Sequence, residues 1–131
     1  MNAPSDSLTI LNFWATWCKP CVAELPVFEK IRKEHRKLPV RFFYISLDFK
    51  EEKSRKLDPF IQKKLPGACV WLLDETDYNQ WLGKIDATWS GAIPATLLFQ
   101  NSTKKRIFAE SELSEEKLRS LIQKFTLKSN Q

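Results

Sequence analysis

The sequence is short of the residues that build metal sites and disulfide frameworks. Its 131 residues include only three cysteines and one histidine. Three cysteines are too few for the disulfide framework of a small secreted domain. A zinc site needs four ligands, and besides Cys18 and Cys21 the chain offers only Cys69 and His35, without a second C-x-x-C or an H-x-x-x-H pair. The sequence therefore argues against zinc, and we assign no metal ligands.

Long apolar runs are also missing. No stretch approaches the roughly 18 consecutive apolar residues expected of a membrane span. Residues 1–7 contain no apolar signal region, and we expect them to form a flexible tail. We therefore expect no membrane span in this chain. Such a start does not assign a compartment, because a leader can be removed from the sequence at hand.

The charge pattern excludes another class of function. The net charge of +5 comes from 21 basic and 16 acidic residues that are mostly interspersed, with the densest cluster at residues 104–106. Because no basic stripe is interleaved with aromatic residues, we expect no nucleic-acid partner. Charge of this sign can still steer acidic protein partners. With 43% hydrophobic residues, residues 1–131 are expected to fold alone as one domain. We expect this domain to be a monomer.

The most informative feature is a pair of cysteines three positions apart, where an apolar strand gives way to a helix. Residues 8–14 are almost all apolar, which predicts a buried strand, and residues 22–31 repeat apolar side chains at helical spacing. Cys18 then lies where a helix begins, and free backbone N–H groups and the helix dipole favour a thiolate there. We therefore expect Cys18 to attack a partner disulfide and Cys21, one turn further on, to resolve the mixed disulfide.

The two residues between the cysteines fit this chemistry. Pro20 suits the first turn of a helix, because it lacks an N–H and has a fixed φ, and it stiffens the short loop between the sulfurs. Lys19 adds a positive charge. If that charge lies near Cys18, it favours the thiolate and makes the disulfide a somewhat stronger oxidant.

The middle of the chain alternates strand and helix patterns. Residues 40–47 are apolar and rich in aromatics, which predicts a second buried strand parallel to the first. Residues 57–65 carry apolar side chains on one helical face and are stopped by Pro66-Gly67. Residues 68–73 then resemble a buried strand, so Cys69 is expected to be a small core residue.

The last third of the chain predicts a short helix, a hairpin and a final helix. The short helix spans residues 78–85, and the hairpin joins residues 96–100 to 106–109 through a turn without glycine. Ser114 is the expected N-cap of the last helix, between two leucines that form a hydrophobic staple, Leu113 and Leu118.

Two motifs carry a family resemblance. Residues 12–21, NFWATWCKPC, followed by Glu24-Leu25-Pro26, resemble the thioredoxin superfamily, in particular its TlpA/ResA-like thiol-disulfide oxidoreductases. Residues 91–99, GAIPATLLF, resemble the second signature of this family, a cis-proline loop that enters a strand. The resemblance implies an α/β thioredoxin fold, in which a central mixed β-sheet is flanked by helices on both faces.

The resemblance also implies how further residues contribute to the site. Pro94 would be cis and lie beside the sulfurs, and the backbone of Ile93 would pair with an extended substrate segment. Trp17 would flank the active-site surface and contact substrate, while Trp14 packs nearer the core.

A proton acceptor for the resolving cysteine is a separate question. Asn12 stands where thioredoxin has a buried aspartate, and an amide cannot accept a proton in that way. Glu24 matches the active-site glutamate of ResA-like proteins, and a helix places it on the same side as Cys21. If Glu24 is partly buried, its pKa rises toward the range useful for proton transfer.

The function implied by the resemblance is that of a protein-disulfide reductase. It would reduce disulfide-bearing protein substrates, receive electrons from an upstream donor, and need no cofactor beyond its own Cys18–Cys21 disulfide. The resemblance favours the periplasm or another exported setting, with the cytoplasm as the alternative.

Three other functions remain open as alternatives. A thiol peroxidase would need P-x-x-x-T-x-x-C, whereas Thr16 lies only two residues before Cys18 and the proline is missing. A Sco-type copper protein would need C-x-x-x-C. A non-catalytic or metal-binding thioredoxin-fold module is the third, and the presence of both cysteines and of the proline signature argues against it.

Overall fold

The computed structural model describes residues 7–35, 39–74 and 78–125. The expected tail lies mostly outside these ranges. Its last residue, Ser7, is buried, which the expectation of a flexible tail through residue 7 did not anticipate. The reason is that Ser7 directly precedes the central strand of the sheet.

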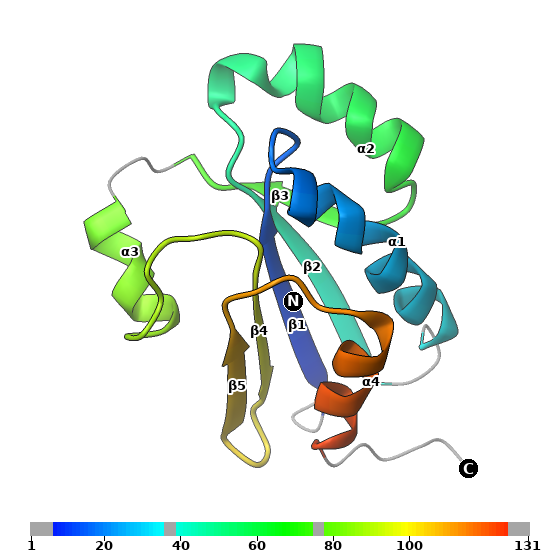
Figure 1. Cartoon of the computed structure of the whole chain (residues 1–131), viewed down its shortest axis with the longest axis vertical. Helices are drawn as coiled ribbons and strands as arrows, with labels where there is room; N and C mark the ends of the chain where they lie inside the picture. Colours follow the sequence, from blue (N-terminus) through cyan, green and yellow to red (C-terminus); the bar gives the residue numbers. More distant parts are fainter. Residues whose placement is uncertain (1–6, 36–38, 75–77, 126–131) are drawn as a thin grey trace.

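A five-stranded mixed sheet forms the centre of the molecule (Figure 1). The strands lie in the order β3-β2-β1-β4-β5, with β1 in the middle. β2 is parallel to β1 and to β3, whereas β4 is antiparallel to β1 and to β5. The strands span β1 Leu8–Trp14, β2 Val40–Ser46, β3 Cys69–Leu72, β4 Ala95–Gln100 and β5 Lys105–Ala109.

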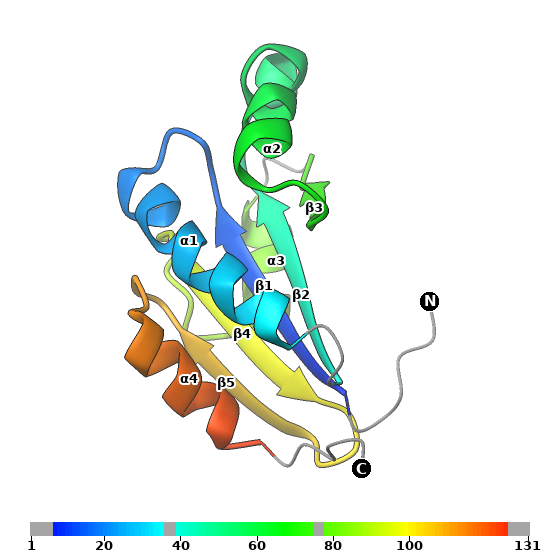
Figure 2. The same ribbon diagram turned by 90° about the vertical axis from the view of Figure 1, so that its right-hand side faces the viewer.

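Helices cover both faces of this sheet, as expected (Figures 1 and 2). α1, α2 and α4 contribute side chains to a hydrophobic cluster on one face, and α3 contributes to a second cluster on the other. A 3-10 turn and a π-helical turn lead into α2. The bounds are α1 Lys19–Glu34, η1 Lys50–Glu52, η2 Lys53–Leu57, α2 Asp58–Lys64, α3 Tyr78–Ile85 and α4 Glu115–Gln123.

The two clusters follow from the alternation of side chains along the strands. Along β1, Ile10 and Trp14 belong to the cluster beneath α1, whereas Phe13 belongs to the cluster beneath α3. All three are at most 2% exposed. The apolar character of β1 therefore reflects burial on both faces, as the sequence predicted.

The prediction of a buried strand around Cys69 is wrong in one respect. The strand exists, but Cys69 is exposed and Trp71 is 54% exposed. β3 lies at the edge of the sheet, and the cluster beneath α3 is built around Phe13 and Ile45, nearer the middle of that face. Of the β3 residues, the alternate ones, Val70 and Leu72, pack against the hydrophobic cluster on the opposite face.

The C-terminal elements agree with the prediction. The β4–β5 turn has no glycine and instead places Lys104 in the left-handed region, with φ of 58°. Ser114 caps α4, because its Oγ accepts the Lys117 N–H at 3.1 Å, and both flanking leucines are buried.

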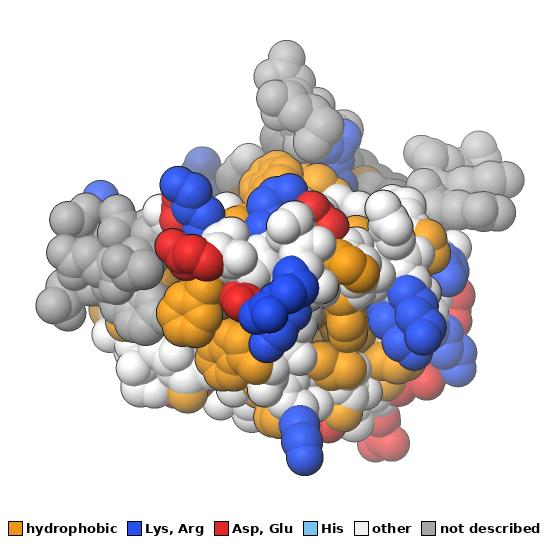
Figure 3. Space-filling model, turned by 90° about the horizontal axis from the view of Figure 1, so that it is seen from above, with side chains coloured by type: hydrophobic (Ala, Val, Ile, Leu, Met, Phe, Trp, Pro, Cys, Tyr) orange, Lys and Arg blue, Asp and Glu red, His pale blue; other side chains and the backbone are white. Residues whose placement is uncertain are grey.

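The end of the molecule that carries the β1–α1 loop and α2 is mixed in character. Seen from this end, hydrophobic side chains lie between those of lysine and arginine (Figure 3). Among the described residues no helix is long and apolar enough to cross a membrane.

Candidate active site

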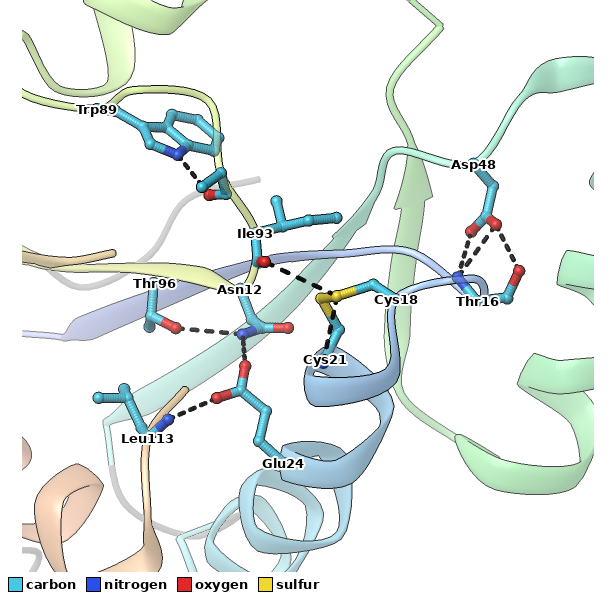
Figure 4. Close-up of a disulfide and its surroundings, with 11 residues drawn as sticks. Asn12, Thr16, Cys18, Cys21, Glu24, Asp48, Trp89, Ile93, Thr96 and Leu113 are labelled. Carbon is cyan, nitrogen blue, oxygen red and sulfur yellow. Dashed lines mark hydrogen bonds between the residues drawn. A yellow bond between two sulfur atoms is a disulfide. The ribbon is translucent and has the colours of Figure 1, made fainter. Parts of the chain in front are cut away.

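A disulfide joins Cys18 and Cys21 at the N-terminus of α1 (Figure 4). Cys18 is the N-cap residue of α1, and its Sγ accepts the Cys21 N–H at 3.3 Å. Cys21 is fully buried, whereas Cys18 is 6% exposed. Cys18 is thus the sulfur nearer to solvent, in the position where the helix dipole favours negative charge.

The loop that leads to Cys18 is held by a carboxylate from the loop that follows β2. Asp48 accepts the Thr16 backbone N–H at 3.1 Å and the Thr16 hydroxyl at 2.5 Å. Its other oxygen accepts the Ser46 hydroxyl at 2.6 Å. Because β1 and β2 are parallel, their carboxyl ends meet at one edge of the sheet, and Asp48 can reach across to this loop.

Sequence reasoning missed Asp48. The signal was available, since a lone acidic residue directly follows the apolar run at residues 40–47. No residue in the run itself indicates which loop the carboxylate will hold.

The loop before β4 lies on the other side of the disulfide. The Ile93–Pro94 peptide bond is cis, and the Ile93 carbonyl oxygen lies 3.8 Å from Cys18 Sγ (Figure 4). Pro94 is buried and Ile93 is half-buried. Trp89 steadies this loop, because its indole N–H donates to the Ala92 carbonyl at 2.8 Å. The structure thus brings Ile93, Pro94 and Cys18 together.

Glu24 is buried beneath the disulfide, on the same helix as Cys21 (Figure 4). It is 1% exposed. Its Oε1 accepts Asn12 Nδ2 at 2.9 Å, and its Oε2 accepts the Leu113 backbone N–H at 2.8 Å. Burial raises the pKa of Glu24 to about 7, against the two hydrogen bonds, which lower it. The condition set from the sequence for a raised pKa, burial of Glu24, is therefore met.

Asn12 links Glu24 to the sheet. The same Nδ2 donates to Thr96 Oγ1 at 3.1 Å, on β4. The Oδ1 of Asn12 is buried and has no hydrogen-bond partner among the described residues. The links from Asn12 to Thr96 and from Glu24 to Leu113 were not visible in the sequence, because they join residues 84 and 89 positions apart.

The remaining predicted site residues lie around the sulfurs at the surface. Trp17 is 57% exposed, and Lys19 and Pro20 are exposed in the first turn of α1. Trp14 is fully buried and packs on Phe60, with ring centroids 5.2 Å apart. The separate expectations for the two tryptophans are confirmed in their burial.

The two remaining candidates for metal ligation stand apart from the site. Cys69 is exposed on β3, and His35 caps the far end of α1, where its Nδ1 lies 2.9 Å from the Ile31 carbonyl. Within the described part of the chain, no three His, Cys, Asp or Glu side chains gather in a way that could hold a metal ion.

A mixed sheet with a C-x-x-C disulfide at a helix N-terminus and a neighbouring cis-proline loop defines a protein of the thioredoxin-fold class. Comparison with protein-family models agrees, because residues 2–104 match the AhpC/TSA family. The chain belongs to this family.

Individual relatives are similar over different lengths. Thiol-disulfide oxidoreductase ResA of Bacillus cereus is 28% identical over 117 residues, which cover 88% of this chain and 62% of ResA. Thioredoxin-like protein YneN of Bacillus subtilis is 65% identical over 26 residues, 20% of this chain and 15% of YneN. The chain thus spans less than two thirds of the length of these curated relatives.

A solved structure agrees in fold. The thioredoxin-related protein from Neisseria meningitidis serogroup B superposes with a TM-score of 0.75 at 24% identity, over 94% of this chain and 85% of that one. This likeness establishes the thioredoxin fold predicted from the sequence.

Proposed function

We propose that this chain is a thiol-disulfide oxidoreductase that reduces disulfides in protein substrates through Cys18 and Cys21. One arrangement carries the proposal: the disulfide at the N-terminus of α1, with Cys18 Sγ 3.8 Å from the Ile93 carbonyl beside a cis proline. The name of the relative ResA, a thiol-disulfide oxidoreductase, supports the same chemistry.

The first step forms a mixed disulfide. In the reduced protein the Cys18 thiolate attacks one sulfur of the substrate disulfide, and the other substrate sulfur leaves as a thiolate that takes a proton from solvent. The position of Cys18 favours its thiolate, because its sulfur accepts a backbone N–H at the positive end of α1. Lys19 adds positive charge nearby, and Pro20 stiffens the turn between the sulfurs.

The second step releases the reduced substrate. The Cys21 thiol gives its proton to the Glu24 carboxylate, and the Cys21 thiolate attacks Cys18 Sγ. The mixed disulfide breaks, the second substrate sulfur leaves and is protonated, and the Cys18–Cys21 disulfide remains. Two electrons have then passed to the substrate. A carboxyl group with a pKa of about 7 can accept and return this proton near neutral pH.

The substrate segment would lie extended along the loop before β4. Its backbone would pair with Ile93, and its side chains would contact Trp17, which is 57% exposed. We expect the protein to act as a monomer, with an upstream dithiol donor that restores the reduced pair and no bound cofactor. The TlpA/ResA-like motifs favour an exported setting such as the periplasm over the cytoplasm.

Two measurements test this function. The first is the reduction potential of the Cys18–Cys21 pair, from tryptophan fluorescence in graded glutathione or dithiothreitol buffers. A strongly reducing value is expected, and a markedly oxidising one would contradict the direction proposed.

The second measurement is trapping with a disulfide-bearing protein such as insulin. Cys21→Ser should accumulate a mixed disulfide with it, and Cys18→Ser should not. Turnover by Cys18→Ser, or consumption of hydrogen peroxide in place of insulin reduction, would overturn the proposal.

A further inference from the structure

A groove runs between α1 and α2 and begins at Val22, the residue after Cys21. It encloses about 410 Å³. Its apolar lining comes from Val22, Leu25 and Pro26 of α1 and from Phe60 of α2. Figure 1 shows α1 and α2 as neighbouring helices, and none of the proposed exchange steps uses the groove between them.

The groove lies along α1 on the C-terminal side of the two cysteines. Val22 and Pro26 follow Cys18 by four and eight residues, a spacing that keeps them on one side of the helix. At about 1.5 Å per residue, Pro26 lies roughly 12 Å along the helix from Cys18. A polypeptide joined to Cys18 in a mixed disulfide would need about four extended residues to cover this distance.

Lysines surround the apolar floor. Lys30, Lys33 and Lys64 line the groove and are exposed. Lys30 pairs with Glu115 at 3.1 Å, whereas Lys33 and Lys64 form no ion pair with another described residue. Two positive charges of the rim are therefore available to a partner.

The acidic residue that lines the groove does not cancel this charge. Glu29 is 7% exposed, and its carboxylate oxygens accept two hydrogen bonds from Arg32 at 2.8 Å and one from the Tyr44 hydroxyl at 2.7 Å. Its charge is thus compensated from within the protein. What the groove presents to solvent is an apolar floor with a positive rim.

We propose that this groove binds an acidic segment with apolar side chains in the protein that exchanges disulfides at Cys18. The proposal rests on the proposed function and adds to it the chemistry of the partner. Apolar side chains of that segment would fill the floor, and its carboxylates would meet Lys33 and Lys64. Charge complementarity of this kind selects partners and speeds encounter, and salt weakens it.

The first test compares rates with synthetic disulfide peptides. One peptide carries a Gly-Gly-Leu-Glu-Leu-Glu tail after its disulfide loop, and the matched peptides carry lysine for glutamate, serine for leucine, or no tail. The reduced protein should reduce the acidic, apolar peptide about fivefold faster than the tailless one at low salt. Lys33→Glu/Lys64→Glu should abolish this advantage and leave the tailless rate unchanged.

A matched variant separates the groove from the net charge. Lys84→Glu/Lys104→Glu changes the net charge equally at α3 and the β4–β5 turn, away from the groove, and should keep the fivefold advantage. The proposal is overturned if the groove variant keeps the advantage, if both variants lose it equally, or if the serine tail works as well as the leucine tail.

A binding measurement keeps the groove distinct from the redox chemistry. The same tail without cysteines is titrated into the oxidised protein, and backbone NMR shifts are mapped. Shifts centred on Val22 and Phe60, reduced in the groove variant, are expected. If these shifts are absent, the proposed binding in the groove is overturned, even if the tailless peptide is reduced. If the tail binds but no peptide is reduced, only the proposed function is overturned.

Discussion

The buried carboxylate of Glu24 is tied to Asn12 through a hydrogen bond of 2.9 Å, which joins α1 to the central strand of the sheet. Thioredoxin places an acid at the Asn12 position, whereas this chain carries its acid on the facing helix. Burial raises the pKa of Glu24 to about 7. Near neutral pH a substantial fraction of the molecules therefore holds a proton on Glu24. The proposed exchange moves a proton between this carboxyl group and Cys21.

The first prediction concerns stability against pH. The folded pKa of Glu24, about 7, lies above its ordinary value of 4.5, so the folded state binds the extra proton between these values. The resulting stabilisation is present below about pH 4.5 and is lost as the pH rises through 7. Between pH 5 and 8 the oxidised protein should lose about 2 to 3 kcal/mol of unfolding free energy through this group.

Urea unfolding of the oxidised protein at pH 5 and pH 8 measures this loss. Glu24→Gln keeps the shape of the side chain but cannot titrate. The unfolding free energy of this variant should therefore fall less between pH 5 and pH 8, by the amount that Glu24 contributes. Equal losses in the two proteins would show that Glu24 titrates in its ordinary range.

The second prediction concerns the rate of resolution. Glu24→Gln should slow the attack of Cys21 on a mixed disulfide at Cys18 by about tenfold or more, because the proton acceptor is removed. Stopped-flow tryptophan fluorescence with a mixed disulfide of a small thiol follows this step. The first step, which starts from the Cys18 thiolate, should be little changed and serves as the internal control. An unaltered resolution rate would remove Glu24 from the mechanism.

Short-range signals made the N-terminal starts of α1 and α4 predictable. The helix start at Cys18 followed from the change of periodicity at the C-x-x-C segment, and the Ser114 cap followed from the leucines around it. Both depend on neighbours within a few residues. The burial of Glu24 depends partly on Leu113, 89 residues away, and its position was available only through family resemblance.

The exposure of Cys69 shows the opposite case. An apolar run is the same in sequence whether a strand lies in the middle of a sheet or at its edge. Strand order decides between the two, and here it leaves one face of β3 open.

The third prediction follows from this exposure. Cys69 should react with N-ethylmaleimide in the native oxidised protein, while Cys18 and Cys21 are protected by their disulfide. Mass spectrometry should show a single added label, and Cys69→Ser should show none. The variant should also keep the full rate of disulfide reduction, since Cys69 lies apart from the site. Labelling only after unfolding would contradict the exposed position.

The fourth prediction concerns Asp48, whose carboxylate receives the N–H and the hydroxyl of Thr16 two residues before Cys18. Asp48→Ala leaves these donors and the buried Ser46 hydroxyl without their acceptor, which should cost about 2 to 4 kcal/mol of unfolding free energy. The loop that carries Cys18 should loosen with it, and the attack of Cys18 on a disulfide should slow. Urea unfolding, hydrogen exchange at the Thr16 amide and the rate of mixed-disulfide formation measure the three effects.

Asp74→Ala, at an exposed carboxylate beyond β3, is the matched control and should change none of them. If Asp48→Ala slows mixed-disulfide formation but does not speed hydrogen exchange at the Thr16 amide, Asp48 acts on Cys18 through its charge and not by holding the loop.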